Sequence, residues 1–388
     1  MLRCMLLTIL SASAAFQASA AERPFCSDCA ATRAFFRKHC DYVLAHKNNH
    51  KVIFIGGYYG RTLVAGYKIF HDRRYLDAAV AYADKLLALQ SPRGYWGTGY
   101  HDIYLADTGS ALGLFIALYN DVGKDRRQKY VDAVTKYVTA IEKDGLINPS
   151  GALGTGWRAT ADGTITGPYR DEYTISSALT GGEIFTWMYY RTGNTHYRDV
   201  AYRALRWIFS TMRQDGKIPY VLAGEGASPA KAGDPKNDQE LWQRWPYDTS
   251  AYVGEGLLSF ALYAKSPKQV SELETDVRPH IEWLLRTQNA DGTWAVKGSG
   301  DQKRSPGVVD LLIWYYTSVK RDPRIAEAVR KFDAFLLVPG QARTFGLLSA
   351  DPDNTGAGTT NEDVATSLAG RAIADILRPG IDSNWQAK

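Results

Sequence analysis

The residues best suited to chemistry stand directly before a run of small and apolar residues. Arg244, Trp245, Tyr247 and Asp248 form a charged, aromatic cluster, and residues 249–260 follow as TSAYVGEGLLSF. A surface helix alternates polar and apolar faces, so a helix that is apolar on nearly every side is expected to be buried. The cluster would then lie at the N-terminus of that helix, where the helix dipole favours negative charge. We therefore expect a buried helix with a reactive mouth.

Similar clusters precede or open five other stretches rich in Gly, Ala, Tyr and Leu. They consist of Tyr58, Tyr59 and Arg61; Tyr100, His101, Asp102 and Tyr104; Tyr169, Arg170, Asp171, Glu172 and Tyr173; Lys303, Arg304 and Ser305; and Asn361, Glu362 and Asp363. Gathered at one end of a molecule, they would line a cleft with aromatic platforms, arginines and carboxylates. Aromatic rings stack on sugar faces, and arginine binds carboxylates with two parallel hydrogen bonds. The pattern predicts a groove for an acidic saccharide, which the 24 tyrosines and 10 tryptophans also fit.

β-Elimination on a uronic acid polymer is the first reaction that suits such a groove. The proton on C5 becomes acidic only when the neighbouring carboxylate is neutralised; a base then removes it while an acid protonates the leaving oxygen. We assign Tyr247 as the acid and a candidate base, and His101 as the alternative base or the neutralising group. Glu172 would help to neutralise or orient the carboxylate. Arg244 would bind uronate and lower the pKa of Tyr247 from its usual value of about 10.

The remaining mouth residues are assigned to substrate binding. They are Arg170, Tyr58, Tyr59, Trp157, Tyr169, Trp245, Asp248, Arg304 and Glu362. Several of the assigned residues have an equally simple structural explanation. Asp248 is a good helix N-cap, and the ring of Tyr247 can pack as a staple at the helix start. Glu183 and Glu255 lie inside buried stretches, where a carboxylate must be paired or functional.

Two alternatives to elimination remain open. Inverting hydrolysis needs two carboxylates roughly 6.5–9.5 Å apart, as paired aspartates would provide in an unsaturated glucuronyl hydrolase. The candidates are Asp102, Asp171 or Glu172, Asp248, and Glu362 or Asp363. The second alternative is a non-catalytic periplasmic toroid that binds sugar, although the number of ionisable residues favours an enzyme. Nucleic-acid binding has no support, because no basic run with interleaved aromatic residues occurs.

Two kinds of helix must position these residues. Amphipathic, highly charged helices are predicted at 31–47, 73–90, 124–143, 195–214, 268–288 and 323–337. Helices rich in Gly, Ala, Tyr and Leu alternate with them at 56–70, 103–120, 172–190, 249–263, 307–319 and 362–377. Hardly any β-type alternation interrupts this pattern. We predict an all-α (α/α)6 toroid, in which charged outer helices surround buried inner ones, with a seventh helix pair as the alternative.

Four of the charged helices end in related turns, which form a weak internal repeat. The turns lie at 90–96, 143–147, 214–218 and 288–294, and each has a Gly followed two residues later by an aromatic or aliphatic residue. The Gly supplies a left-handed cap, and the residue after it can fold back onto the barrel. Long connections at 148–170, 219–245 and 343–361 precede inner helices. Connections of this length are usually functional, so we expect them to wall the groove, with 224–239 as a lid.

The N-terminal 20 residues are typical of a secretory signal cleaved after Ala20. Residues 21–388 would then form one toroidal catalytic domain, located in the periplasm or secreted. Hydrophobic residues make up 45% of the chain and charged ones 22%, which suffices for one large core. The formal charge of +5 falls by one when Arg3 leaves, and a mildly basic protein suits an anionic partner. Cys26, Cys29 and Cys40 remain, and we expect one disulfide near the first helix, with its pairing open.

With these features the chain resembles the toroidal polysaccharide lyases over nearly its whole mature length. Among them it is most similar to polysaccharide lyase family 38, whose members act on alginate or glucuronan. Asn48-Asn49-His50 repeats a motif of family 5 alginate lyases, but it precedes the first inner helix instead of lying on a core helix. The resemblance implies a lyase that uses a tyrosine with His, Asn, Glu or Arg partners.

We accordingly expect a monomer that acts on an anionic polysaccharide without a cofactor or metal. We expect no nucleic-acid partner and no membrane partner. Residues 351–362 overlap a calcium-loop pattern, but the pattern fails at its fifth position, Thr355, and Pro352 is awkward within it. An ordinary loop rich in Gly and Asp is therefore predicted there.

Overall fold

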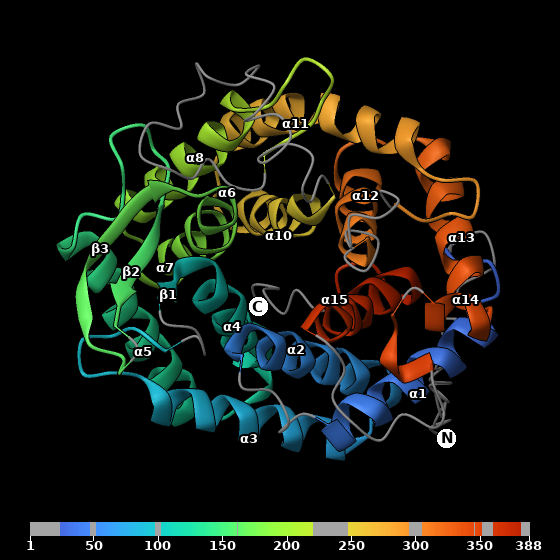
Figure 1. Cartoon of the computed structure of the whole chain (residues 1–388), viewed down its shortest axis with the longest axis horizontal. Coiled ribbons are helices and arrows are strands. Elements are labelled where there is room, and N and C mark those ends of the chain that lie inside the picture. The colour runs from blue at the N-terminus through green and yellow to red at the C-terminus, as the bar shows by residue number, and fades with distance from the viewer. Residues whose placement is uncertain are drawn as a thin grey trace, which may run out of the picture.

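A closed double ring of helices forms the molecule (Figure 1). The computed structural model describes residues 24–46, 52–97, 102–160, 162–219, 247–294, 305–344, 346–350 and 360–381. The inner helices of this part are α2 (Ile53–Phe70), α4 (Leu105–Leu118), the continuous rod of α6 (Thr174–Ser176), the π-helical η3 (Ser177–Phe185) and α7 (Thr186–Thr192), α10 (Asp248–Tyr263), α12 (Pro306–Ser318) and α15 (Thr360–Leu377). Each contacts the next, and α15 returns to α2. The predicted toroid is confirmed.

The outer helices surround this ring in the same chain order. They are α1 (Cys29–His46), α3 (Arg73–Leu89), α5 (Lys124–Lys143), α8 (Thr195–Ser210), α11 (Pro267–Thr287) and α13 (Pro323–Leu336). Short segments complete the described structure: η2 (Tyr119–Asp121), α14 (Pro339–Thr344) and η7 (Leu348–Ala350). Among the described residues no helix is both long and apolar enough to cross a membrane.

Neighbouring inner helices lie so close that a side chain would not fit at several contacts. A Cβ atom added at Gly57 would lie 2.6 Å from the Cα of Ala111, and one added at Gly60 would lie 2.6 Å from Leu114. The contacts advance by three residues on both helices, so α2 and α4 run parallel. Parallel inner helices place all their N-terminal ends at one end of the ring.

The links between helices differ in length at the two ends of the ring. Inner helices pass to outer ones through short links at 71–72, 119–123, 193–194, 264–266 and 319–322. Outer helices return to inner ones through longer links at 47–52, 90–104, 144–173, 211–247, 288–305 and 337–359. The long links therefore gather where the inner helices begin, and we call this end the mouth.

The predicted turn repeat is confirmed in atomic detail at two places. The side-chain amide of Gln90 donates to Gly94 O and to Ala133 O of α5, at 2.9 and 2.8 Å. Gln288 makes the equivalent pair of bonds to Gly292 O and Ala328 O, at the same distances. Each turn thus fastens one outer helix to the next outer helix along the chain.

The tryptophan of each turn folds back onto its own helix, as predicted. Trp96 Nε1 donates to Leu86 O at 2.7 Å, and Trp294 Nε1 donates to Leu284 O at 2.8 Å. Both indole rings are fully buried. The repeat in the sequence is therefore a repeated device that closes the outer ring.

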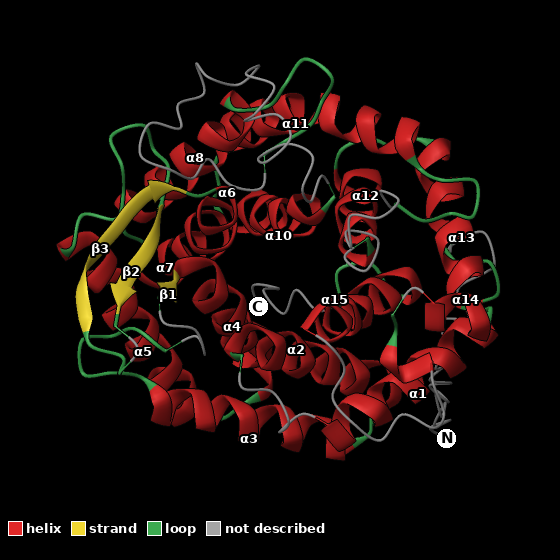
Figure 2. Ribbon diagram, in the orientation of Figure 1, coloured by secondary structure: helices red, strands yellow, loops and turns green. Residues whose placement is uncertain are grey.

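A small antiparallel sheet stands beside α5 and corrects the expectation of an uninterrupted helical chain (Figure 2). It contains β1 (Ile103–Tyr104), β2 (Gly154–Ala159) and β3 (Ile165–Glu172), in that order. The connection predicted as a loop at 148–170 therefore contains a β-hairpin. Its tight turn includes Gly163 with a φ of +84°, and the Asp162 carboxylate accepts a bond from Thr164 N at 3.0 Å.

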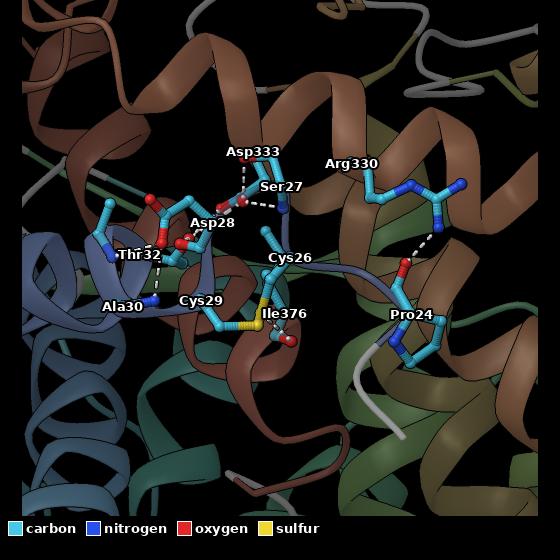
Figure 3. Close-up of a disulfide and its surroundings, with 11 residues drawn as sticks. Pro24, Cys26, Ser27, Asp28, Cys29, Ala30, Thr32, Arg330, Asp333 and Ile376 are labelled. Atoms are coloured by element: carbon cyan, nitrogen blue, oxygen red, sulfur yellow. Dashed lines mark hydrogen bonds between the residues drawn. A yellow bond between two sulfur atoms is a disulfide. The ribbon is translucent and has the colours of Figure 1, made fainter. Parts of the chain in front are cut away.

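The N-terminal segment carries the one disulfide of the described residues. Cys26 is bonded to Cys29, the first residue of α1, whereas Cys40 is a buried thiol on the same helix (Figure 3). The pairing left open by the sequence is thereby assigned. The bridge holds the segment against α15, where Cys26 Sγ lies 3.8 Å from Ile376 O.

The same segment joins the beginning of the ring to its end. The Asp333 carboxylate on α13 accepts bonds from the backbone N and the Oγ of Ser27, both at 2.6 Å, and from Thr32 Oγ1 at 2.9 Å. Arg330 Nη1, one turn earlier on α13, donates to Pro24 O at 2.6 Å (Figure 3). The first outer helix and the last are thus held together.

Candidate functional site at the mouth of the ring

The structure describes only some of the residues that the sequence singles out for chemistry. His101, Arg244, Trp245 and Arg304 lie outside the described residues, as do the predicted signal segment, the lid at 224–239 and most of the calcium-like loop. Asp248 begins α10, but its side chain is also outside what is described. The site is therefore built from the mouth residues that remain.

Tyr247 packs against the outer ring. Its ring stacks on Trp283 of α11, with the centroids 4.9 Å apart and the planes inclined by 19°. Only 5% of the residue is exposed. This is the staple at the helix start that the sequence offered as the alternative to a catalytic role, because the ring of the residue before α10 packs against an outer helix.

The prediction that Trp157 forms a sugar subsite is wrong. The residue is fully buried, and its Nε1 donates to the Asp144 carboxylate at 2.7 Å. Its ring contacts those of Tyr95 and Tyr137, with centroid distances of 5.2 and 6.4 Å. A ring enclosed in this way fastens the β-hairpin to α5 and offers no face to a ligand.

Arg170 and Glu172 also make contacts within the hairpin region. Arg170 donates from Nε to Gly145 O at 3.1 Å and from Nη2 to Asp144 O at 2.9 Å, so it caps the carboxyl end of α5. Glu172 accepts a hydrogen bond from Ser150 Oγ. Both side chains reach the surface, but each has a structural partner in this arrangement.

The predicted subsite residues Tyr58 and Tyr59 are corrected in the same sense. Both are fully buried in the wall of the inner ring. Burial, followed by the charge of Glu255, raises the pKa of Tyr58 well above its usual range, and burial followed by Asp363 does so for Tyr59. Neither phenol can contact a saccharide from this position.

Glu362 lies at the start of α15 on the side that faces α1. The Tyr42 phenol of α1 has its pKa raised to about 12 by burial, then by the charges of Asp363 and Glu362. Glu362 is partly exposed and Asp363 is buried. The two acids therefore form a group with the outer helix and do not converge with the residues of the β-hairpin.

A second group of predicted residues does come together, at the start of α4. Asp102 precedes β1 and accepts a bond from Ala159 N of β2 at 3.0 Å. The pKa of Tyr104 is raised by burial and then by the charges of Asp102 and Asp107. Tyr169 of β3 is also close, since the charge of Asp102 contributes to its raised pKa after burial and Asp171.

Arg158 provides a cation at this place. Its guanidinium lies over the Tyr169 ring, 4.5 Å from the centroid, and its side chain is exposed. Guanidinium groups held on aromatic rings remain available to carboxylates. The exposed Arg158 and the half-buried Tyr169 together form a platform beside Asp102 and Tyr104.

Asp107 is the mouth residue that the sequence reasoning missed. It is the third residue of α4 and the one acid in this otherwise apolar helix, LADTGSALGLFIAL, which was the available signal. One turn after it, Ser110 lies beside Tyr58 of α2, and Leu114 lies against Gly60. Asp107 therefore belongs to the stripe of α4 that faces the first inner helix. The residue is partly exposed, and its Oδ2 atom is buried.

Beneath the mouth, a chain of alternating charges crosses the middle of the ring. We call Glu183, Arg61, Glu255, Arg371 and Asp310 the central charge chain. Arg61 Nη1 lies 2.6 Å from Glu255 Oε2, and Arg61 Nη2 lies 3.4 Å from Glu183 Oε1. Arg371 pairs with the other oxygen of Glu255, and its Nη2 lies 3.8 Å from Asp310 Oδ2. All five residues are at most 5% exposed.

Other features of the described residues offer no competing site. No group of three or more His, Cys, Asp and Glu lies close enough there to hold a metal ion. A surface hollow of about 750 Å³ lies between α3 and α5, lined by residues that include Asp84, Gly123 and Arg126. It is on the outside of the ring, and Arg126 already pairs with Asp84 within it at 2.8 Å.

Comparisons with solved structures match nearly the whole ring. A possible member of the GH105 family from Salmonella enterica subsp. enterica serovar Paratyphi A has a TM-score of 0.61 at 8% identity, covering 89% of this chain and 93% of that chain. A polysaccharide lyase has a TM-score of 0.60 at 13% identity, covering 90% and 97%. The chain has the (α/α)6 toroid fold. No protein-family model and no curated protein matches the sequence.

The toroid fold does not determine the reaction. A type II terpene cyclase from Scytonema matches with a TM-score of 0.53 at 13% identity, over 90% of this chain and 98% of that chain. The resemblance to family 38 lyases is thereby broadened to toroids of several reaction classes. Chemistry must be argued from the mouth itself.

Proposed function

We propose that the protein cleaves glycosidic bonds of a polysaccharide or its fragments at the mouth, with Asp107 and Asp102 as the pair of working carboxylates. The observation that carries the proposal is the position of Asp107, a partly exposed acid in the first turn of the inner helix α4. Glycosidic cleavage needs one carboxyl group to protonate the leaving oxygen and a second to activate water or stabilise the sugar cation. After burial, the charges of Asp102 and Asp107 both raise the pKa of Tyr104, so both carboxylates lie near that phenol.

Asp102 and Asp107 have different surroundings, which suit them to different roles in the reaction. Asp102 is held by the backbone amide of Ala159, which fixes its direction. Asp107 lies in the first turn of α4, is partly exposed, and has a buried Oδ2 atom. We assign Asp107 to proton transfer and Asp102 to orientation of water or substrate. Toroids that include a possible GH105 family member support a carbohydrate substrate by fold.

The platform beside the acids indicates an acidic sugar. Arg158 is exposed on the Tyr169 ring and can take a carboxylate with two hydrogen bonds. Tyr169 provides the apolar surface on which a sugar ring rests. We therefore propose a uronate-containing substrate, in a protein exported by the predicted signal segment.

β-Elimination is the second candidate, because the same platform could bind the uronate carboxylate of a lyase substrate. A polysaccharide lyase shares the fold. The pKa values of Tyr104 and Tyr169 are raised, however, so these phenols are suited to donating a proton and not to removing one. Elimination would then depend on Tyr247, His101 and Arg244, and the first of these packs against Trp283.

A single assay separates the two reactions. Purified protein without residues 1–20 is incubated with alginate, glucuronan, hyaluronan and pectate, and with unsaturated oligosaccharides made from each. New reducing ends without a rise in ultraviolet absorbance indicate hydrolysis, and loss of absorbance from an unsaturated fragment indicates an unsaturated uronyl hydrolase. A rise in absorbance indicates elimination. Binding without any product would support the sugar-binding toroid instead.

The assay is repeated with Asp107→Asn and with Asp125→Asn as the matched control. Asp125 also lies in the first turn of a helix, but on the exposed outer helix α5. We expect Asp107→Asn to lower kcat at least about 100-fold and Asp125→Asn to leave it unchanged. Equal activity of the two variants at equal melting temperatures would remove Asp107 from the reaction.

A further inference from the structure

The central charge chain draws one charged side chain from five of the six inner helices. Arg61 comes from α2, Glu183 from η3, Glu255 from α10, Asp310 from α12 and Arg371 from α15. The sixth inner helix, α4, contacts the central charge chain at Gly113, where an added Cβ atom would lie 2.5 Å from Arg61 Nη1. The whole inner ring therefore meets at this level.

Glu255 is the hub of the chain. One of its oxygens accepts a bond from Arg61 at 2.6 Å, and the other pairs with Arg371 and accepts from Tyr58 Oη at 2.8 Å. Its side chain is fully buried. A buried pair that loses one partner leaves an uncompensated charge, so Glu255 constrains both arginines together.

The pairs of the hub cross the seam of the ring. Arg371 belongs to the last inner helix and Arg61 to the first, and both bind the same carboxylate of α10. The helices α15 and α2 also touch directly, since a Cβ atom at Gly370 would lie 2.1 Å from Thr62 Oγ1. The hub therefore fixes how the two ends of the inner ring meet.

The hub also reaches the candidate site through Tyr58. The guanidinium carbons of Arg61 and Arg371 lie 5.8 and 5.7 Å from the centroid of the Tyr58 ring. Burial dominates the raised pKa of Tyr58, and the Ser110 hydroxyl beside it acts in the opposite sense. Ser110 lies one turn after Asp107 on α4, so the Tyr58 phenol stands between the hub and the helix that bears Asp107.

We propose that Glu255 is a positioning residue: through Arg61, Arg371 and Tyr58 it holds the inner ring closed beneath the mouth and fixes α4 and its Asp107 relative to α10. The part about Asp107 rests on the proposed function, whereas the part about ring closure does not. Glu255 does not touch substrate, because the hub is enclosed. Its effect is to keep the mouth groups aligned.

Three variants separate positioning from simple stabilisation. Tyr58→Phe keeps the ring and removes the contacts of its hydroxyl with Glu255 and Ser110. Glu255→Gln keeps the shape and removes the charge that both arginines share. Asp310→Asn is the matched control, because it removes a carboxylate of the same chain that lies 3.8 Å from Arg371 and outside the hub.

Hydrogen exchange followed by mass spectrometry tests ring closure without reference to any reaction. At a temperature well below unfolding, we expect Glu255→Gln to speed exchange of α2 and α15 amides at least about tenfold, and Asp310→Asn to change it much less. Unchanged exchange in α2 and α15 of Glu255→Gln would overturn the closure role. Should this variant not fold, Tyr58→Phe is judged in its place, with faster exchange confined to α2, α4 and α10 as the expected result.

Kinetics tests the positioning of the mouth. Tyr58→Phe is expected to lower kcat about tenfold with KM within about twofold, at a temperature where it is fully folded. Unchanged kcat together with faster exchange would mean that the hub only stabilises the fold, and the positioning role would be wrong. If the unaltered protein cleaves no saccharide, the proposed function fails, and the exchange experiment alone decides the closure role.

Discussion

The ring of Tyr247 stacks on that of Trp283, with centroids 4.9 Å apart. This contact joins the residue before an inner helix to an outer helix and leaves Tyr247 only 5% exposed. A side chain used in this way is expected to matter for packing through its ring, which phenylalanine retains.

Tyr247→Phe is therefore expected to keep the stack, with a melting temperature within about 2 °C of the unaltered protein and kcat within about threefold. Melting is followed by circular dichroism and turnover by the assay described above. A loss of more than about 100-fold in kcat, with unchanged melting, would restore the role of Tyr247 as the proton donor of an elimination.

Trp157→Phe tests the correction of the predicted subsite. The change removes the bond from Nε1 to Asp144 and leaves a small cavity beside Tyr95 and Tyr137, so we expect a loss of about 1–3 kcal/mol in unfolding free energy. Denaturant unfolding measures it. KM is expected to stay within about twofold, because the buried ring touches no substrate; a much larger KM at unchanged stability would contradict this placement.

The two glutamines of the turn repeat are expected to contribute equally. Gln90→Ala and Gln288→Ala each remove one side-chain bond within the turn and one to the next outer helix, so each should cost about 1–2 kcal/mol. The double variant should show the sum within about 0.5 kcal/mol, since the turns lie on separate helix pairs. Denaturant unfolding of all four proteins checks both points, and a negligible cost at either turn would mean that the repeat is not a fastening device.

Two buried histidines make stability depend on pH. Burial lowers the pKa of His39 and of His280 to about 4 from the usual 6.5. His280 Nδ1 lies 2.8 Å from Gly216 O and therefore carries the hydrogen of a neutral ring, while Nε2 accepts from Ser250 Oγ. Between pH 6.5 and 4 the unfolded chain binds protons that the folded chain does not, so stability is lost as pH falls through this window.

Each histidine should account for about 3 kcal/mol across that window. The unfolding free energy is measured at pH 7.5, 5.5 and 4.5. Its fall with decreasing pH should correspond to the uptake of about two protons on unfolding in the unaltered protein and of about one in His280→Gln. A stability that is flat over this range would show that these rings are protonated, or hydrated, in the folded state.

Much of the architecture could be predicted from helical periodicity. The predicted helix at 124–143 coincides with α5, and the other helix ranges differ mainly at their ends. The β-hairpin was missed because its strands are short and contain three glycines, Gly154, Gly156 and Gly167, which weakens the two-residue alternation. The Asp162-Gly163 pair was the usable signal, since this dipeptide favours tight hairpin turns.

The site was less accessible from sequence, for reasons of packing. The sequence does not distinguish a tryptophan that stacks on a ligand from one that is buried in the core. For Trp157 the contact with Asp144 shows that the residue belongs to the core. Glu255 was expected to need a partner, but Arg61 and Arg371 lie 194 and 116 positions away, and helical patterns do not say which helices meet across a ring. Asp107 was overlooked because it lies inside an inner helix and not before it.

The most direct test of the account measures reducing ends and ultraviolet absorbance together, over time, for the unaltered protein and for Asp107→Asn on the panel of uronate polymers and their unsaturated fragments. We predict new reducing ends without a rise in absorbance, and their loss in Asp107→Asn but not in Asp125→Asn. A rise in absorbance that survives in Asp107→Asn would contradict it and show an elimination carried out by other residues of the mouth.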